Sequence, residues 1–249
     1  MRRTIRIGCS GWHYDDWRGR FYPPDLPPAR WLQAYADRFD CVEINNSFYR
    51  LPEKATFAGW RAQVPSRFLF AVKASRYLTH IRRLREPSPP LKRLLTRVQP
   101  LGTALGPLLY QLPPRWIPDR ERLRTFLGAL PRTAMIGGRR RRLRHVVEFR
   151  DPRGYDPEVL DLLRRHHVSL CVHDMPGSTP PRVVTGPLVY LRLHGYRARY
   201  GGSYPKPVLR EWAAWLTDAA SRTPALVFFN NDIGGRAVAN AETLRELLA

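Results

Sequence analysis

Acidic, basic and imidazole side chains recur near the carboxyl ends of short apolar segments in this sequence. The clearest case is residues 188–194, where three apolar residues alternate with Tyr190, Arg192 and His194. Successive side chains of a strand point to opposite faces, so this period of two places the arginine and the histidine together on one face. Residues 41–45 show the same alternation and turn Glu43 and Asn45 to a common face.

The fifth such segment, residues 145–149, adds an acidic side chain, Glu148, and is followed directly by a basic one, Arg150. The two alternate with apolar neighbours. Arginine offers bidentate geometry to phosphate or carboxylate, whereas lysine acts as a point charge. Carboxylates serve as general acids or bases, and histidine moves protons near neutral pH. We therefore predict the catalytic residues Glu148, Asp174, His194 and Glu43. The predicted substrate-binding residues on the strands are Lys73, Arg150, Arg192, Asn45, Gln111 and Asn230.

Two other interpretations of these inward charges remain open. A buried charge must find a partner, so three cations and three carboxylates could form a closed salt-bridge network instead of a site. Its members would be Lys73, Arg150, Arg192, Glu43, Glu148 and Asp174. The carboxylates, with His173 and His194, are also suitable donors for a divalent metal. We rank a metal below a metal-free site, because three nearby cations would repel it and no HExxH-like spacing occurs, and we predict no cofactor.

Aromatic and glycine-rich loops follow several of these segments. Trp12 and Tyr14 lie in an aromatic loop after the first segment, where such rings suit stacking on sugars or bases. For Trp17, Phe21 and Tyr22 we favour a small satellite core. Residues 195–204, which include Tyr204, combine glycine, arginine and tyrosine, a composition that fits either a mobile anion clamp or a solvated loop. His80 is a further substrate-site residue, in the loop after the third segment.

The elements that must position these residues are short strands alternating with longer amphipathic stretches, which indicates parallel βα units. The predicted strands are residues 5–9, 41–45, 68–74, 107–112, 145–149, 168–173, 188–194 and 225–230. The predicted helices include residues 53–62, 91–98, 120–130, 208–220 and 237–248, and helical spacing recurs at 31–39 and 159–163. A Pro/Gly loop at 174–181 replaces the sixth helix.

Eight such units in 249 residues predict a single (β/α)₈ TIM-barrel domain over residues 1–249. In characterised barrels of this class the active site lies at the carboxyl ends of the strands, which is where the polar residues above fall. The arginine run at 139–144 precedes the fifth strand and so belongs to the opposite end. We interpret that run as a solvated loop.

Composition bears on partners and compartment. The net charge is +21 and lysine occurs at only four positions, so nearly all the positive charge is arginine. Such a surface attracts nucleic acid, although a GC-rich coding bias produces the same skew. Cys9, Cys41 and Cys171 lie far apart in apolar segments, which favours free thiols in a reducing compartment. With no secretory signal and no long apolar run, we expect a cytoplasmic protein without a membrane partner.

The ordered motifs of the chain closely resemble the YecE-like family, catalogued as domain of unknown function 72. They include Gly8-Cys9-Ser10-Gly11-Trp12, Val42-Glu43-Ile44-Asn45-Asn46-Ser47-Phe48-Tyr49-Arg50, Phe70-Ala71-Val72-Lys73, Gln111-Leu112-Pro113-Pro114, Val147-Glu148-Phe149-Arg150, Arg192-Leu193-His194-Gly195 and Phe229-Asn230-Asn231. The resemblance implies a TIM barrel with some likeness to xylose-isomerase-like barrels, which include metal-dependent apurinic endonucleases. It implies no reaction and no catalytic residue. The arginine run and Cys9 depart from the family pattern.

We therefore expect an enzyme with acid–base chemistry of the hydrolase or lyase type, and an endonuclease-like activity is one form that this chemistry could take. Its partner would be an anionic small molecule or nucleic acid, such as a phosphorylated sugar, a nucleotide or a damaged strand. The alternatives are a nucleic-acid-binding protein without chemistry and a small-molecule sensor or scaffold. The sequence predicts neither the substrate nor the oligomeric state.

Overall fold

Eight parallel strands alternate with helices along the chain in the computed structural model, which describes residues 5–116, 119–178 and 180–249. The strands that carry the sheet are β1 (Ile5–Cys9), β2 (Cys41–Ile44), β3 (Leu69–Lys73), β4 (Leu105–Gln111), β7 (His145–Glu148), β8 (Ser169–Asp174), β9 (Val189–Leu193) and β10 (Ala225–Phe229). All eight predicted strands are confirmed, with ends that move by about two residues or fewer, as expected of fraying strand and helix ends.

In the described part of the chain, seven helices of eight or more residues cover these strands. They are α1 (Trp31–Arg38), α3 (Lys54–Ala62), α4 (Ser88–Val98), α5 (Arg120–Ala129), α6 (Pro157–Arg165), α7 (Lys206–Ala219) and α8 (Arg236–Leu248). Between β8 and β9 the described residues form no helix, so the missing sixth helix is confirmed there. The order of neighbouring strands, β1-β10-β9-β8-β7-β4-β3-β2, and the parallel pairing of neighbours give the (β/α)₈ TIM-barrel fold class.

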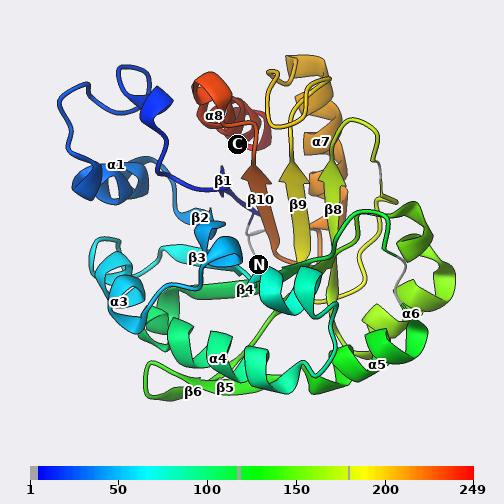
Figure 1. Cartoon of the computed structure of the whole chain (residues 1–249). Coiled ribbons are helices and arrows are strands. Elements are labelled where there is room, and N and C mark those ends of the chain that lie inside the picture. Colours follow the sequence, from blue (N-terminus) through cyan, green and yellow to red (C-terminus); the bar gives the residue numbers. More distant parts are fainter. Residues whose placement is uncertain (1–4, 117–118, 179) are drawn as a thin grey trace. The chain divides into compact units, whose positions relative to one another are not determined.

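The described chain forms two compact units. The first unit comprises Met1–Glu43, Val172–Val184 and Leu188–Ala249. In it β1, β10 and β9 pair in parallel, with Ile5 opposite Ala225 and Ala225 opposite Val189. Helices α7 and α8 lie along these strands (Figure 1). Leu209, Trp212 and Leu216 form the buried side of α7, which fits their helical spacing.

The aromatic loop after β1 also belongs to the first unit. Trp17 is fully buried, and its ring lies 5.5 Å from that of Phe21 and 5.8 Å from that of Tyr22. Tyr22 in turn stacks on Trp31 at 5.1 Å. The satellite core predicted for this loop is confirmed.

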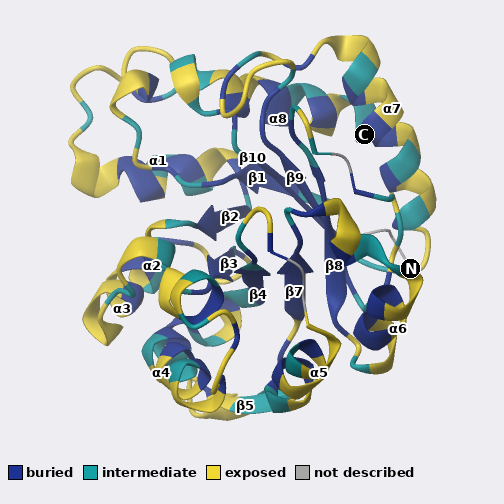
Figure 2. Cartoon of the chain, turned by 45° about the vertical axis from the view of Figure 1, so that its right-hand side comes forward, coloured by how far each residue is buried: buried dark blue, intermediate teal, exposed yellow. Residues whose placement is uncertain are grey.

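The second unit comprises Ile44–Cys171 and Thr185–Pro187. Its strands β3, β4 and β7 and the start of β8 pair in parallel. Strands such as β7 are buried along their whole length, whereas α4 and α5 expose one side to solvent (Figure 2). A four-residue helix, α2 (Asn46–Tyr49), and a π-helical turn, Tyr77–Ile81, follow β2 and β3. Neither of these short elements has a periodic sequence pattern long enough to predict it.

One prediction in this unit is wrong. The arginine run forms strand β6 (Arg139–Arg142), which pairs antiparallel with β5 (Thr133–Ile136) in a hairpin. Four consecutive arginines show no alternation of apolar and polar residues, so the pattern conceals the strand. The Gly137-Gly138 turn, with φ of 58° and 74°, was the available signal. Most of the run is exposed, as predicted.

No helix in the described ranges is long and apolar enough to cross a membrane.

Candidate functional site

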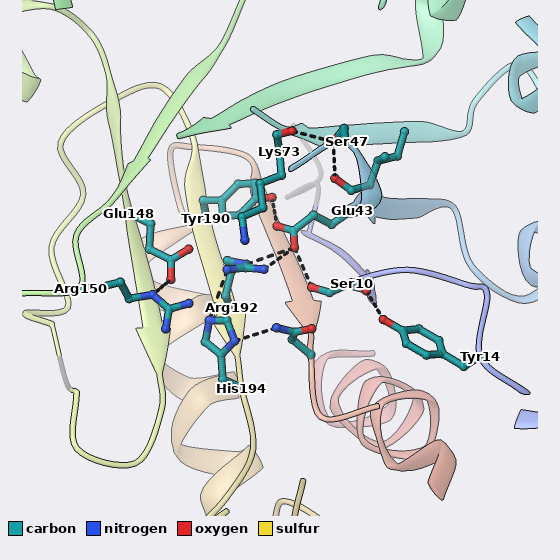
Figure 3. A network of polar contacts seen from close by, with 12 residues as sticks. Ser10, Tyr14, Glu43, Ser47, Lys73, Glu148, Arg150, Tyr190, Arg192 and His194 are labelled. Atoms are coloured by element: carbon teal, nitrogen blue, oxygen red, sulfur yellow. Dashed lines mark hydrogen bonds and ion pairs between the residues drawn. The ribbon is translucent and has the colours of Figure 1, made fainter. Parts of the chain in front are cut away.

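In the first unit a buried carboxylate organises the polar residues at the strand ends. Glu43, near the end of β2, is fully buried and accepts hydrogen bonds from three side chains. Ser10 Oγ donates to Oε1 at 2.7 Å, and Tyr190 OH donates to Oε2 at 2.5 Å. Arg192 donates to Oε1 from Nη2 at 2.7 Å and from Nε at 3.1 Å (Figure 3). We call these residues, together with His194, the Glu43 network.

The network continues from Arg192 to the end of β9. Nη1 of Arg192 lies 3.4 Å from Nε2 of His194. The amide nitrogen of Asn230 lies 2.9 Å from Nδ1 of the same ring. His194 is fully buried. Arginine can only donate, so Nε2 of His194 is the acceptor in that contact, and a ring that accepts at Nε2 carries its hydrogen on Nδ1, toward the side-chain amide of Asn230. Strand alternation therefore predicted correctly that Tyr190, Arg192 and His194 share one face.

The first unit contains a second buried carboxyl, Asp232, which was not predicted from the sequence as a site residue. Asp232 follows β10, and burial, opposed by a hydrogen bond from the side chain of Tyr14, raises its pKa to about 7. The negative charges of Asp16 and Glu43 act in the same upward direction. The Tyr14 hydroxyl donates to the carbonyl oxygen of Ser10 at 2.6 Å. The sequence signal that could have identified Asp232 is its place shortly after the last strand, β10. No other sequence pattern marks this residue.

Asp174 and Tyr204 lie close together in the first unit. Burial raises the pKa of Asp174, while hydrogen bonds from Trp212 and Tyr204 and the charge of Arg182 lower it. The Tyr204 hydroxyl lies 3.4 Å from the backbone oxygen of Asp174 and accepts a hydrogen bond from the amide of Gly195 at 3.1 Å. Tyr204 is buried, which places it in a packed rather than a solvated part of its loop.

Trp12, predicted to stack on a substrate, is 2% exposed. Its ring centroid lies 4.9 Å from that of His13, and its carbonyl oxygen accepts a hydrogen bond from Tyr22 at 2.8 Å. Substrate stacking by Trp12 would therefore require its neighbours to move.

In the second unit the cations predicted to bind substrate lie among aromatic and acidic neighbours. Lys73, the last residue of β3, is 9% exposed, and its Nζ lies 4.2 Å from the ring centroid of Phe48. Ser47 Oγ donates to the Lys73 carbonyl oxygen at 2.6 Å (Figure 3). This bond ties α2, which carries Phe48, to the end of the strand. The Phe48 ring also packs edge-on against His80 at 4.9 Å.

The pKa of His80 is lowered by burial and by the positive charges of this unit. Burial, and after it the charges of Lys73, Arg76 and Arg150, together lower its pKa to about 4. Thr79 Oγ1 lies 2.9 Å from Nδ1 of the ring. His80 is half-buried and therefore retains access to solvent. We call Lys73, Arg76, His80 and Arg150 the cationic cluster.

Glu148 and Arg150 form a buried ion pair at the carboxyl end of β7. Arg150 Nε lies 2.5 Å from Glu148 Oε1, and the two side chains are 6% and 0% exposed (Figure 3). Of the remaining predicted residues in this unit, Gln111 donates to the backbone oxygen of Leu112 at 3.2 Å, and Asn45 precedes α2 half-exposed. The salt-bridge interpretation thus matches Glu43 with Arg192 and Glu148 with Arg150, whereas Asp174 interacts with Trp212 and Tyr204.

Within residues 5–116, 119–178 and 180–249, no three His, Cys, Asp or Glu side chains are grouped to hold a metal ion. The three cysteines are free and buried, and burial is the main cause that raises the pKa of Cys9 and Cys41.

The parallel βα units, with polar side chains near the carboxyl ends of the strands, define a TIM-barrel protein. The chain belongs to the family described as protein of unknown function DUF72, whose model matches residues 6–249.

Three relatives illustrate the family. The UPF0759 protein YunF of Bacillus subtilis is 25% identical over 98% of this chain and 94% of its own length. The UPF0759 protein YecE of Escherichia coli is 36% identical over 101 residues, 40% of this chain and 37% of its own. A crystal structure of a DUF72 family protein from Thermotoga maritima superposes with a TM-score of 0.87 at 25% identity, covering 98% of this chain and 99% of that one.

Proposed function

We propose that this protein is an enzyme that performs acid–base chemistry on a substrate bearing a phosphate or carboxylate group. The observation that carries the proposal is the environment of His80, whose ring lies 4.9 Å from Phe48, the same ring that Lys73 Nζ contacts at 4.2 Å, and whose pKa is lowered by burial and by the charges of three cations. Cations gathered beside a partly buried site are stabilised by a bound anion. Two members of the cluster, Lys73 and Arg150, lie at the carboxyl ends of β3 and β7. Barrel enzymes have their active sites at this end of the strands.

In this proposal Lys73 binds the anionic group and His80 is the base. The imidazole is neutral at physiological pH, so it is ready to accept a proton from the substrate. A bound anion offsets the charges of Lys73, Arg76 and Arg150 and raises the pKa of His80 toward the working pH. The base therefore becomes effective when the substrate is present.

The remaining parts of the second unit fit this assignment. Arg150 orients Glu148, whose carboxyl is a second candidate for proton transfer. A hollow of ≈ 380 Å³ opens just after Lys73 and is lined in part by Ala74, Ser75 and Tyr77. Tyr77 and Tyr49, which also lines the hollow, are 50% and 74% exposed, and such rings suit the body of a sugar or nucleotide.

In the first unit, the geometry of the Glu43 network favours a positioning role for Glu43. Its two oxygens already accept four hydrogen bonds, so the carboxylate fixes Arg192 and has little capacity left to act as a base. Asp232 is the better acid–base candidate of that unit, because a pKa of about 7 lies near the working pH.

The test is conversion of a defined mixture of phosphorylated sugars, nucleotides and short oligonucleotides, followed by mass spectrometry. We expect one class of compound to be consumed, and we expect His80→Gln to slow its consumption about 100-fold or more while binding persists. Lys73→Met should weaken binding at least about tenfold. His166→Gln, which changes the half-exposed histidine that follows α6 and lies outside the cationic cluster, is the matched control and should leave turnover unchanged. No conversion of any compound, or full turnover by His80→Gln, would contradict the proposal.

A further inference from the structure

A second basic region lies at the other end of the second unit's strands. A hollow of ≈ 490 Å³ is lined there by Leu69, Leu105 and Gly106, which lie at the amino ends of β3 and β4. Lys73 lies at the opposite end of β3, so this hollow is separate from the cationic cluster. Thr103 and five arginines complete the lining, and the arginines are Arg139, Arg140, Arg141, Arg142 and Arg144.

The β5–β6 hairpin holds four of these arginines, residues 139–142, on a defined backbone. Thr133 pairs with Arg142 and Ile136 with Arg139, so the strands are in register from end to end. The turn packs closely on the rest of the unit, because a Cβ on Gly137 would lie 2.9 Å from the Cα of Gly102. Ile136 is 1% exposed and anchors the hairpin beneath the arginines. The basic side chains therefore extend from a fixed platform, not from a solvated loop.

None of the five arginines forms an ion pair with a carboxylate anywhere in the described ranges. Other arginines of the unit do so, for example Arg153 with Asp151 at 2.7 Å and Arg164 with Asp161 at 2.6 Å. A side-chain hydrogen bond of the run is to a neutral group, from Arg140 Nε to Thr133 Oγ1 at 3.1 Å. Burial and the charge of Arg142 lower the pKa of Arg144. Like charges held together without counter-charges favour an anionic ligand.

We propose that this hollow, the arginine hollow, binds the phosphate backbone of a nucleic acid. Arginine binds phosphate oxygens with two parallel hydrogen bonds, and five guanidinium groups exceed what one small anion needs. Alternate residues of a strand are about 6.7 Å apart, so the run offers donors to successive phosphates on each face. Among the described residues no aromatic side chain lines the hollow, so we expect binding that is independent of base sequence.

The net charge of the chain, +21, favours the same ligand. It produces a long-range field that attracts a polyanion more strongly than a singly charged molecule. This inference is independent of the proposed catalytic function, because it rests on residues at the opposite end of β3 and β4.

The experiment compares the affinities of the full-length protein and two quadruple variants for a labelled mixed-sequence 20-mer, single-stranded and double-stranded, across a series of salt concentrations. One variant replaces Arg139, Arg140, Arg141 and Arg142 with glutamine. The control replaces four exposed arginines of the same unit that lie outside the hollow, Arg83, Arg85, Arg124 and Arg165, and so removes the same charge. Circular dichroism and thermal unfolding establish that each variant is folded.

We expect the hairpin variant to lose at least about tenfold more affinity than the control at 0.1 M salt, with a shallower salt dependence. Each lost phosphate contact reduces the slope of log K against log salt by about 0.9 for a duplex and about 0.7 for a single strand. A third variant with lysine at the same four positions keeps the charge and should retain most of the affinity. If the hairpin variant and the control lose affinity equally, the proposal is wrong.

Competition identifies the ligand chemistry. An excess of inorganic triphosphate or of a poly-glutamate peptide should displace the oligonucleotide only weakly at equal charge concentration. Displacement by triphosphate as effective as by unlabelled oligonucleotide would identify a small-anion site. Displacement by the peptide would identify an acidic protein partner, and either result would overturn the assignment to nucleic acid.

Discussion

Arg192 donates two hydrogen bonds to the same oxygen of Glu43, at 2.7 and 3.1 Å, and both side chains are buried to within 1%. A buried ion pair of this kind gains little over a well-packed apolar pair, but losing one partner leaves an uncompensated charge. The pair therefore fixes the position of Arg192 and, through it, the neighbourhood of His194.

We predict that Glu43→Gln lowers the free energy of unfolding by about 3–5 kcal/mol, because Arg192 then stays buried without its counter-charge. Urea unfolding measures the change. The double variant Glu43→Gln with Arg192→Met removes both charges and should recover a large part of the loss. Equal destabilisation by the single and double variants would show that packing, not charge, dominates here.

Asp232 gives a prediction about pH. Its pKa is raised in the folded state to about 7, whereas an unfolded aspartate has its usual value near 3.8. The folded protein therefore binds more protons than the unfolded chain between these values, and stability falls as the pH rises from about 4 to about 7. Asp232→Asn should abolish this part of the pH dependence and stabilise the protein at pH 8 by about 2 kcal/mol, allowing for partial exposure of the side chain.

The difference in unfolding free energy between wild type and Asp232→Asn, measured at pH 5 and pH 8, is the readout. Asp25→Asn is a suitable control, because it removes an exposed carboxylate of the same unit that is not among the charges acting on Asp232. A difference that does not change with pH would mean that Asp232 titrates normally.

The hairpin turn predicts a contrast between two neighbouring glycines. Both have positive φ, but a Cβ on Gly137 meets Gly102 at 2.9 Å whereas one on Gly138 has no atom within 4 Å. Gly138→Ala should cost about 1 kcal/mol for the backbone conformation alone, and Gly137→Ala should cost about 1–3 kcal/mol more because of the close contact. Thermal unfolding compares them directly. Equal effects would mean that the turn does not pack on Gly102.

The same hairpin shows what the sequence could and could not predict. The eight strands follow from apolar segments and their period of two, and the grouping of Tyr190, Arg192 and His194 follows from the same rule. Strand β6 contains only arginine, so neither periodicity nor propensity marks it. Its pairing depends on the glycine turn and on the tertiary contact with Gly102.

The hydrogen-bond partners of the buried side chains could not be predicted from the sequence for a similar reason. Alternation indicates the face on which Glu43 lies, but three donors on other strands and loops determine that its oxygens are occupied. Asp232 and the importance of His80 were also hidden, because a pKa depends on burial and on charges distant in the sequence.

The measurement that tests the proposed function most directly is the pKa of His80, obtained by NMR from the imidazole resonances of ¹⁵N-histidine-labelled protein over pH 3–8. Sulfate is the probe anion, because it keeps its double charge across this range. In its absence we predict a pKa of about 4, and with saturating sulfate a rise toward 6.5 that Lys73→Met abolishes. The His80→Gln variant assigns the resonance. A pKa near 6.5 without sulfate, or a low value that sulfate does not raise, would contradict an anion-binding cationic cluster.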